Sequence, residues 1–143
     1  MLIDIHSKLR DDAVAELLGQ SVFPDPERIE EAIRTYESGA GHELYGTEEE
    51  GAVVALAGFT MDDAGGLVIK HIAVRPDYRG KGYGRDLVLG LIELKHPRWI
   101  AAETDDEAVG FYRSIGFTIE SLGEKYPGVE RFKCTYDTTE TED

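Results

Sequence analysis

The sequence has little positive charge, a single cysteine and no long apolar stretch. Its 143 residues include 15 lysines and arginines against 29 aspartates and glutamates, which gives a formal net charge of −14. A surface of this sign repels phosphate backbones and anionic membranes, so we expect neither a nucleic acid nor a membrane as partner. It favours a cationic substrate, although acidity is also a common means of keeping a protein soluble.

The other scarcities exclude further classes. The lone Cys134 excludes an intramolecular disulfide and a zinc site built from several cysteines. His6 and His96 stand without neighbouring ligand residues, so we predict no metal site. The N-terminus lacks a basic segment followed by an apolar one, and no apolar run approaches the ~20 residues of a membrane span. We therefore expect a soluble, cytoplasmic protein.

Length and composition predict one ordinary domain. Hydrophobic residues make up 41% of the chain, which is enough for a packed core. We expect a single domain over residues 1–137 and an acidic tail over residues 138–143.

Capping residues and apolar spacing predict four helices. The first begins at Asp11 or Asp12, and the second follows Asp25 as N-cap and ends at Gly39. The third follows a glycine-rich segment and buries Leu87, Val88, Leu91, Ile92 and Leu94. The fourth begins with the capping-box pattern of residues 104–107 (Thr-Asp-Asp-Glu) and ends at Gly116.

Runs of β-prone residues predict seven strands, at residues 1–6, 42–47, 52–60, 67–74, 99–104, 117–122 and 129–136. The second and third strands flank an acidic turn over residues 48–51. The resulting order is β-α-α-β-β-β-α-β-α-β-β. Its central strand–helix–strand unit implies at least one parallel pair of strands.

The glycine-rich segment concentrates positive charge in an acidic chain. Gly80, Gly82 and Gly84 alternate there, and Arg75, Arg79, Lys81 and Arg85 surround them. Glycines allow a close approach of backbone to ligand, and free N–H groups at a helix N-terminus attract anions. A phosphate or pyrophosphate is the natural ligand, and a plain turn with incidental charge is the alternative. The sequence contains neither a Walker A loop nor a G-x-G-x-x-G fingerprint.

Two segments resemble one protein family. Residues 79–84 (Arg-Gly-Lys-Gly-Tyr-Gly) resemble the [RQ]-x-x-G-x-[GA] pyrophosphate loop of the GNAT acetyltransferases, and residues 71–78 are similar to the strand and turn before it. Residues 108–117 are similar to the later A-x-x-[FL]-Y-x-x-x-G-F segment. The resemblance implies a GNAT fold of the α/β class, with a mixed, twisted sheet of about seven strands and helices on both faces. It also implies acetyl-CoA as cosubstrate and allows a homodimer, because relatives often dimerise.

The resemblance implies a set of site residues. The cofactor-binding positions are Ala73, Val74, Arg79, Gly80, Lys81, Gly82, Tyr83, Gly84 and Tyr112. The backbone of residues 79–84 would hold the pyrophosphate, and the Val74 amide would lie near the thioester carbonyl as oxyanion donor. Tyr112 would face the thioester sulfur and act as the acid. Many relatives have asparagine where Asp105 stands, so Asp105 is expected to help the helix cap instead.

Acetyl transfer also needs a neutral amine, and the base that would produce it is left open. His71 and Glu103 are the leading candidates, His42 and Glu43 are others, and water could serve with no dedicated residue. We expect transfer of acetyl from acetyl-CoA to a primary amine of a small molecule or peptide. The alternative is a non-catalytic module that binds acyl-CoA as a sensor or regulator.

Overall fold

The computed structural model describes residues 2–21 and 25–138, and it confirms the expected element order. In chain order the elements are β1 (Ile3–Asp4), the 3-10 turn η1 (His6–Lys8), α1 (Asp12–Ser21), α2 (Pro26–Ser38), β2 (His42–Glu49), β3 (Ala52–Met61), β4 (Gly66–Val74), the 3-10 turn η2 (Pro76–Tyr78), α3 (Tyr83–Lys95), β5 (Trp99–Asp105), α4 (Val109–Ser114), β6 (Thr118–Tyr126) and β7 (Val129–Asp137). The seven strands make the protein a mixed α/β fold, as predicted.

The chain divides into two compact units that share strand β4. The first unit comprises Met1–Thr60 and Lys70–His96, and the second comprises Met61–Ile69 and Pro97–Asp143. The predicted single domain over residues 1–137 stays a prediction. The acidic tail falls largely on residues 139–143, which lie outside the described residues.

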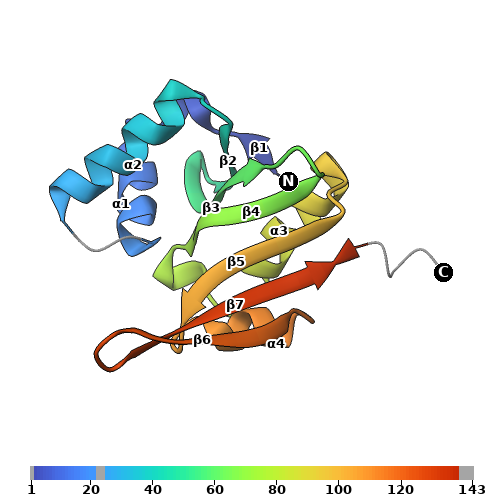
Figure 1. Ribbon diagram of the computed structural model, residues 1–143. Helices are drawn as coiled ribbons and strands as arrows, with labels where there is room; N and C mark the ends of the chain where they lie inside the picture. The colour runs from blue at the N-terminus through green and yellow to red at the C-terminus, as the bar shows by residue number, and fades with distance from the viewer. Residues whose placement is uncertain (1, 22–24, 139–143) are drawn as a thin grey trace. The chain divides into compact units, whose positions relative to one another are not determined.

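In the first unit, helices cover both faces of a sheet with the order β1-β2-β3-β4. Neighbouring residues of a strand point to opposite faces. Leu44 of β2 belongs to a core cluster with residues of α1 and α2, including Tyr36. The next residue back, Glu43, pairs with Lys95 of α3 at 2.6 Å on the other face. Figure 1 shows α1 and α2 (blue and cyan) together on one side of these strands.

Local signals explain the boundaries of α2. The Asp25 carboxylate accepts a hydrogen bond from the Glu27 N–H at 2.9 Å, Pro26 occupies the first turn, and Gly39 ends the helix in the left-handed region. The positions of Asp25 and Gly39 were predicted. The β2–β3 turn differs from the prediction because it is tighter. Strand β2 continues through Glu49, so the turn consists of Glu50 and Gly51, which both have positive φ.

In the second unit the strand order is β4-β5-β7-β6, and α4 packs against β6 and β7 (Figure 1). Strands β4 and β5 are parallel, with Gly66 opposite Trp99, which confirms the predicted parallel pair. The other pairs of this unit are antiparallel. Cys134 of β7 is fully buried as a small apolar residue.

Two predictions about helices were wrong. Leu94 is 46% exposed, and Lys95 lies over the Phe59 ring in the last turn of α3. The capping box at Thr104 does not form, because Thr104 is still part of β5 and α4 begins only at Val109. Asp105 provides the local cap instead, since its carboxylate accepts hydrogen bonds from the N–H groups of residues 107 and 108.

Candidate active site

A run of free backbone N–H groups precedes and opens α3. Gly80 and Gly82 have φ of 74° and 90°, and Gly82 is the N-cap of the 13-residue helix without a side-chain cap. None of the N–H groups of residues 80–85 donates a hydrogen bond to another described residue. Because the helix dipole adds partial positive charge at this end, the turn is suited to an anion that accepts several N–H bonds at once.

The glycines are required for conformation and leave the backbone open. A Cβ added at Gly80 or Gly82 would meet no atom within 4 Å, so the space beside each residue is empty. An L-residue would still be strained there because of the positive φ. These observations fit a pyrophosphate, which needs both the N–H donors and room to approach them.

The four cations of this segment have different roles. Arg75 donates two hydrogen bonds to the Asp77 carboxylate, at 2.8 and 2.6 Å, and stacks over the Tyr78 ring. Lys81 also lies over Tyr78, 5.5 Å from the ring centroid. Lys81 and Arg85 are exposed and make no salt bridge within the described chain. Of the four cations, these two are the ones available to a phosphate.

Arg79 is held by the protein itself. Its guanidinium donates to the Val74 carbonyl at 3.0 Å and to the Gln20 side-chain oxygen at 2.7 Å. Its backbone N–H donates to the Pro76 carbonyl. Arg79 therefore ties the turn to the end of β4 and to α1. The sequence carried no sign of Gln20, because the two residues are 59 positions apart.

Strand β4 leads into this turn with one face buried. Ala73 is buried and Val74 is partly exposed, and the Arg75 N–H donates to the Val54 carbonyl of β3 at 2.8 Å. His71 lies on the Ala73 face of the strand, two residues earlier. The first unit thus brings His71, Ala73, Val74 and the turn together on one continuous segment.

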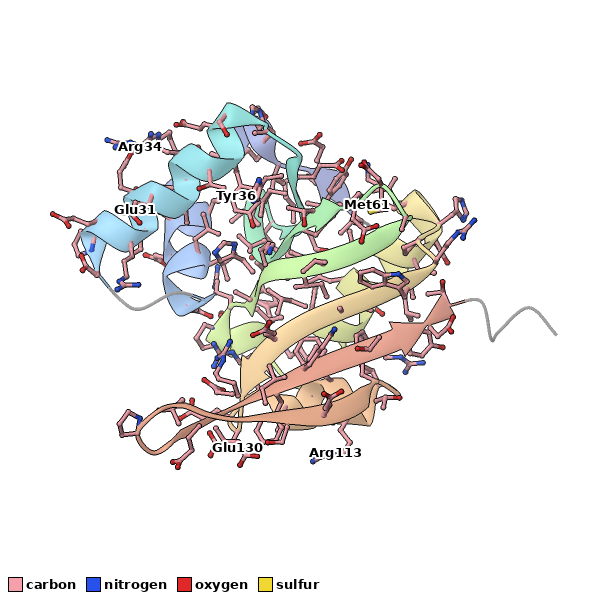
Figure 2. The ribbon with its side chains drawn as sticks, in the orientation of Figure 1. Glu31, Arg34, Tyr36, Met61, Arg113 and Glu130 are labelled. Atoms are coloured by element: carbon pink, nitrogen blue, oxygen red, sulfur yellow. The ribbon has the colours of Figure 1, made fainter. Side chains whose placement is uncertain are left out.

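His71 contacts a residue that sequence reasoning missed. The Tyr36 hydroxyl of α2 lies 2.5 Å from His71 Nδ1, and Figure 2 shows Tyr36 directed from α2 toward the strands. Burial, with smaller contributions from His42 and Lys70, lowers the pKa of His71 to about 4. His71 is therefore neutral at neutral pH. The Tyr36 ring also lies edge-on to His42, at 5.8 Å between centroids.

The second unit contains Tyr112 and Glu103. Tyr112 packs against Phe111 and Phe117, at 5.1 and 5.2 Å between ring centroids, and is only 3% exposed. Burial raises the pKa of its hydroxyl, so the group stays protonated. The hydroxyl has no hydrogen-bond partner among the described residues, so its proton is available to a ligand.

Glu103 and Tyr112 are on opposite faces of the second unit. The β5–β7 register pairs Glu103 with Lys133 and Ala102 with Cys134. Cys134 lies close enough to Tyr112 to influence its ionisation, so the face of Cys134 is the one that carries α4. Because neighbouring residues on a strand alternate, Glu103 points to the other face, where it is exposed.

Within residues 2–21 and 25–138, no group of three or more histidine, cysteine, aspartate or glutamate side chains could hold a metal ion. No helix in these residues is long and apolar enough to span a membrane.

The sequence matches the model of the Acetyltransferase (GNAT) family over residues 8–117. The chain belongs to this family. The GNAT match includes the whole segment from His71 to the start of α3, and it also includes Tyr112. The family's acyl donor is acetyl-CoA.

Proteins similar to this chain are named for different acceptors, a histone in one case and an aminoglycoside in another. The chain is 34% identical over 80 residues to a Glycine max protein named histone acetyltransferase TAP1, covering 54% of this chain and 35% of that protein. An aminoglycoside 6'-N-acetyltransferase solved with coenzyme A superposes with a TM-score of 0.78 at 13% identity, covering 96% of each chain. A GNAT acetyltransferase from Elizabethkingia anophelis, solved with acetyl-CoA, has a TM-score of 0.63 at 20% identity, covering 85% and 88%.

These similarities differ in what they establish. The two structures share the GNAT fold with this chain. The chain spans about a third of the length of the curated relatives it matches. The residues present fit the donor, because the free N–H groups at residues 80–85 are suited to the pyrophosphate of acetyl-CoA.

Proposed function

We propose that the protein is an acetyl-CoA-dependent N-acetyltransferase whose acceptor is a primary amine of a small molecule or peptide. The observation that carries the proposal is the run of N–H groups at residues 80–85, which have no partner within the described chain. Family membership supports acetyl-CoA as the molecule held there.

In this proposal the chain's own residues bind the donor and assist the transfer. The N–H groups of residues 80–85 bind the pyrophosphate, with Lys81 and Arg85 adding charge. The Val74 N–H stabilises negative charge that develops on the carbonyl oxygen, and Tyr112 donates a proton or hydrogen bond to the departing sulfur. The bound acetyl-CoA supplies an activated thioester. The amine nitrogen forms a bond to the acetyl carbon while the carbon–sulfur bond breaks, and free thiol leaves.

The state of Tyr112 supports its role as donor. A hydroxyl that stays protonated and has no hydrogen-bond partner among the described residues is available to a ligand. Glu103 is exposed but lies on the face opposite Tyr112, so the proposed route for the amine's proton to Glu103 is through water and not by direct contact. The net charge of −14 favours a cationic acceptor through long-range attraction.

A non-catalytic sensor of acyl-CoA is the second candidate, because the turn alone suffices for binding. The Tyr112→Phe variant separates the two functions. Acetyl-CoA binding is measured by calorimetry, and turnover by release of free thiol with a panel of amines. We expect unchanged binding and about 100-fold slower release for the variant.

The control is Tyr45→Phe, which removes the same atom from a tyrosine stacked on Phe59 in the first unit. We expect it to behave as the unmodified protein. If the unmodified protein binds acetyl-CoA yet releases no thiol with any amine, the sensor function is correct. If Tyr112→Phe turns over normally, Tyr112 is not the acid.

A further inference from the structure

The contact between Tyr36 and His71 fixes the direction of a hydrogen bond. Tyr36 is fully buried, and burial raises the pKa of its hydroxyl, so the hydroxyl carries its proton. Within the described chain its one hydrogen-bond partner is His71 Nδ1, at 2.5 Å. A buried hydroxyl proton left without an acceptor is costly. The Tyr36 hydroxyl therefore donates, and His71 Nδ1 accepts.

The direction of this bond determines the tautomer of His71. A neutral imidazole has one N–H and one acceptor nitrogen. Because Nδ1 is the acceptor, the proton of the neutral ring is on Nε2. A histidine that works as a base through Nε2 needs the opposite arrangement, with Nδ1–H donating to a carboxylate or carbonyl.

The groups around His71 also oppose its protonation. Tyr36 faces it from α2, His42 acts on it from β2, and Lys70 precedes it on β4. None of these is an anion, and within the described residues no carboxylate contacts the His71 ring. The ring is therefore held as a neutral hydrogen-bond donor.

The space for Tyr36 is provided by a glycine. A Cβ at Gly58 of β3 would overlap the Tyr36 hydroxyl and ring, so the hydroxyl reaches His71 only because position 58 has no side chain. The Tyr36–His71 contact therefore depends on one residue from each of three elements: Tyr36 of α2, Gly58 of β3 and His71 of β4.

We propose that His71 binds the acceptor molecule through an Nε2–H hydrogen bond and does not take the proton of the amine, with Tyr36 as the positioning residue that sets this tautomer. His71 is partly exposed and lies two residues, about 7 Å, before Ala73 on the same face of β4. The inference rests on the proposed N-acetyltransferase function. It names the acceptor class as amines that carry a hydrogen-bond-accepting oxygen, such as a hydroxyl, carbonyl or carboxylate, near the reactive nitrogen.

The variants His71→Gln and His71→Ala test this role by transfer kinetics. Glutamine keeps an oxygen that accepts from Tyr36 and an N–H that donates to substrate, but it cannot act as a base at neutral pH. We expect His71→Gln to raise acceptor KM less than His71→Ala does and to keep the acidic limb of the pH profile, because glutamine retains a hydrogen-bond donor and is not a base. We expect His71→Ala to raise acceptor KM about tenfold with little change in kcat, as for loss of one hydrogen bond.

A substrate comparison makes the test specific. The best amine found is compared with its analogue that lacks the neighbouring oxygen. We expect His71→Ala to lower kcat/KM for the oxygen-bearing amine and to leave the analogue unchanged. If His71→Gln and His71→Ala lose kcat equally, and the acidic limb of the pH profile disappears in both, His71 is the base and the proposal is overturned.

The tautomer is measured independently of activity. Nitrogen NMR of the ¹⁵N-histidine-labelled, unmodified protein at neutral pH should show the proton of His71 on Nε2 and an accepting Nδ1. A proton on Nδ1 would overturn the proposal. Because this measurement needs no substrate, it stands even if no amine is acetylated, which would count against the proposed function alone.

Discussion

The turn before α3 and the Tyr36–His71 pair both belong to the first unit, but they are built in different ways. The turn uses backbone N–H groups over residues 80–85, with glycines at the positions of positive φ. The pair uses two side chains 35 residues apart and an empty position at Gly58. The first is encoded by consecutive residues, and the second depends on how α2 packs on the strands. The turn and the Tyr36–His71 pair should therefore respond to different mutations.

The largest effect on acetyl-CoA binding is expected from Gly82→Asp. The variant places an L-residue at φ 90° and a negative charge at the N-terminus of α3, where the pyrophosphate would bind. For the unmodified protein, acetyl-CoA at 100 times its Kd should raise the free energy of unfolding by about 2.7 kcal/mol. We expect no stabilisation of the variant in thermal melts. Gly128→Asp, at φ 77° in the β6–β7 turn and with no atom within 4 Å of its Cβ, is the control and should respond normally.

Acid should weaken the fold through His71. The folded pKa of about 4 lies below the ordinary value of 6.5, so between these pH values the unfolded chain binds a proton that the folded chain does not. This contribution is fully present above pH 6.5 and is lost as pH falls toward 4, by roughly 3 kcal/mol in total. Denaturant unfolding at several pH values should show a shallower loss for His71→Gln. An equal loss in both proteins would show that His71 is not buried as described.

Gly58→Ala should disrupt the Tyr36–His71 contact although neither tyrosine nor histidine is substituted. The added methyl overlaps Tyr36, and overpacking of this kind costs about 1–3 kcal/mol of unfolding free energy. Gly110→Ala is the matched control, because a Cβ there meets no atom within 4 Å and alanine favours the helix. Equal stability of the two variants in denaturant unfolding would contradict the close approach of Tyr36 to position 58.

The smallest effect is expected from Gln20→Ala, which removes one of the two side-chain hydrogen bonds that hold Arg79. Arg79 is exposed and keeps its bond to the Val74 carbonyl, so calorimetry should show only a threefold to tenfold weaker affinity for acetyl-CoA. Gln20→Glu keeps an acceptor and should restore the affinity. Weak binding by both variants would mean that the Arg79 contact does not support the turn.

Features encoded by neighbouring residues could be predicted from the sequence. The cap at Asp25, the stop at Gly39 and the glycine-rich opening of α3 are each set within a few residues, and the structure has all three. The parallel pairing of β4 and β5 followed from the helix between them. Even local patterns failed where packing decided the result, as at Leu94 and at the unused capping box of Thr104.

The remaining part of the candidate site depends on contacts between distant residues. Gln20 and Arg79 are separated by 59 residues in the sequence, and Tyr36 and His71 by 35. No periodicity or motif in the sequence indicates either contact. The exposed position of Glu103, opposite the α4 face, depends on the β5–β7 register. Sequence reasoning therefore identified the glycine-rich turn and missed the side-chain contacts of Arg79 and His71.

Calorimetric titration of acetyl-CoA into the unmodified protein will show whether the turn before α3 binds the donor. We expect saturable binding at one site per chain, lost in Gly82→Asp and retained in Gly128→Asp. A folded protein that binds no acetyl-CoA at millimolar concentration, or one that binds equally well with Gly82→Asp, would contradict this expectation.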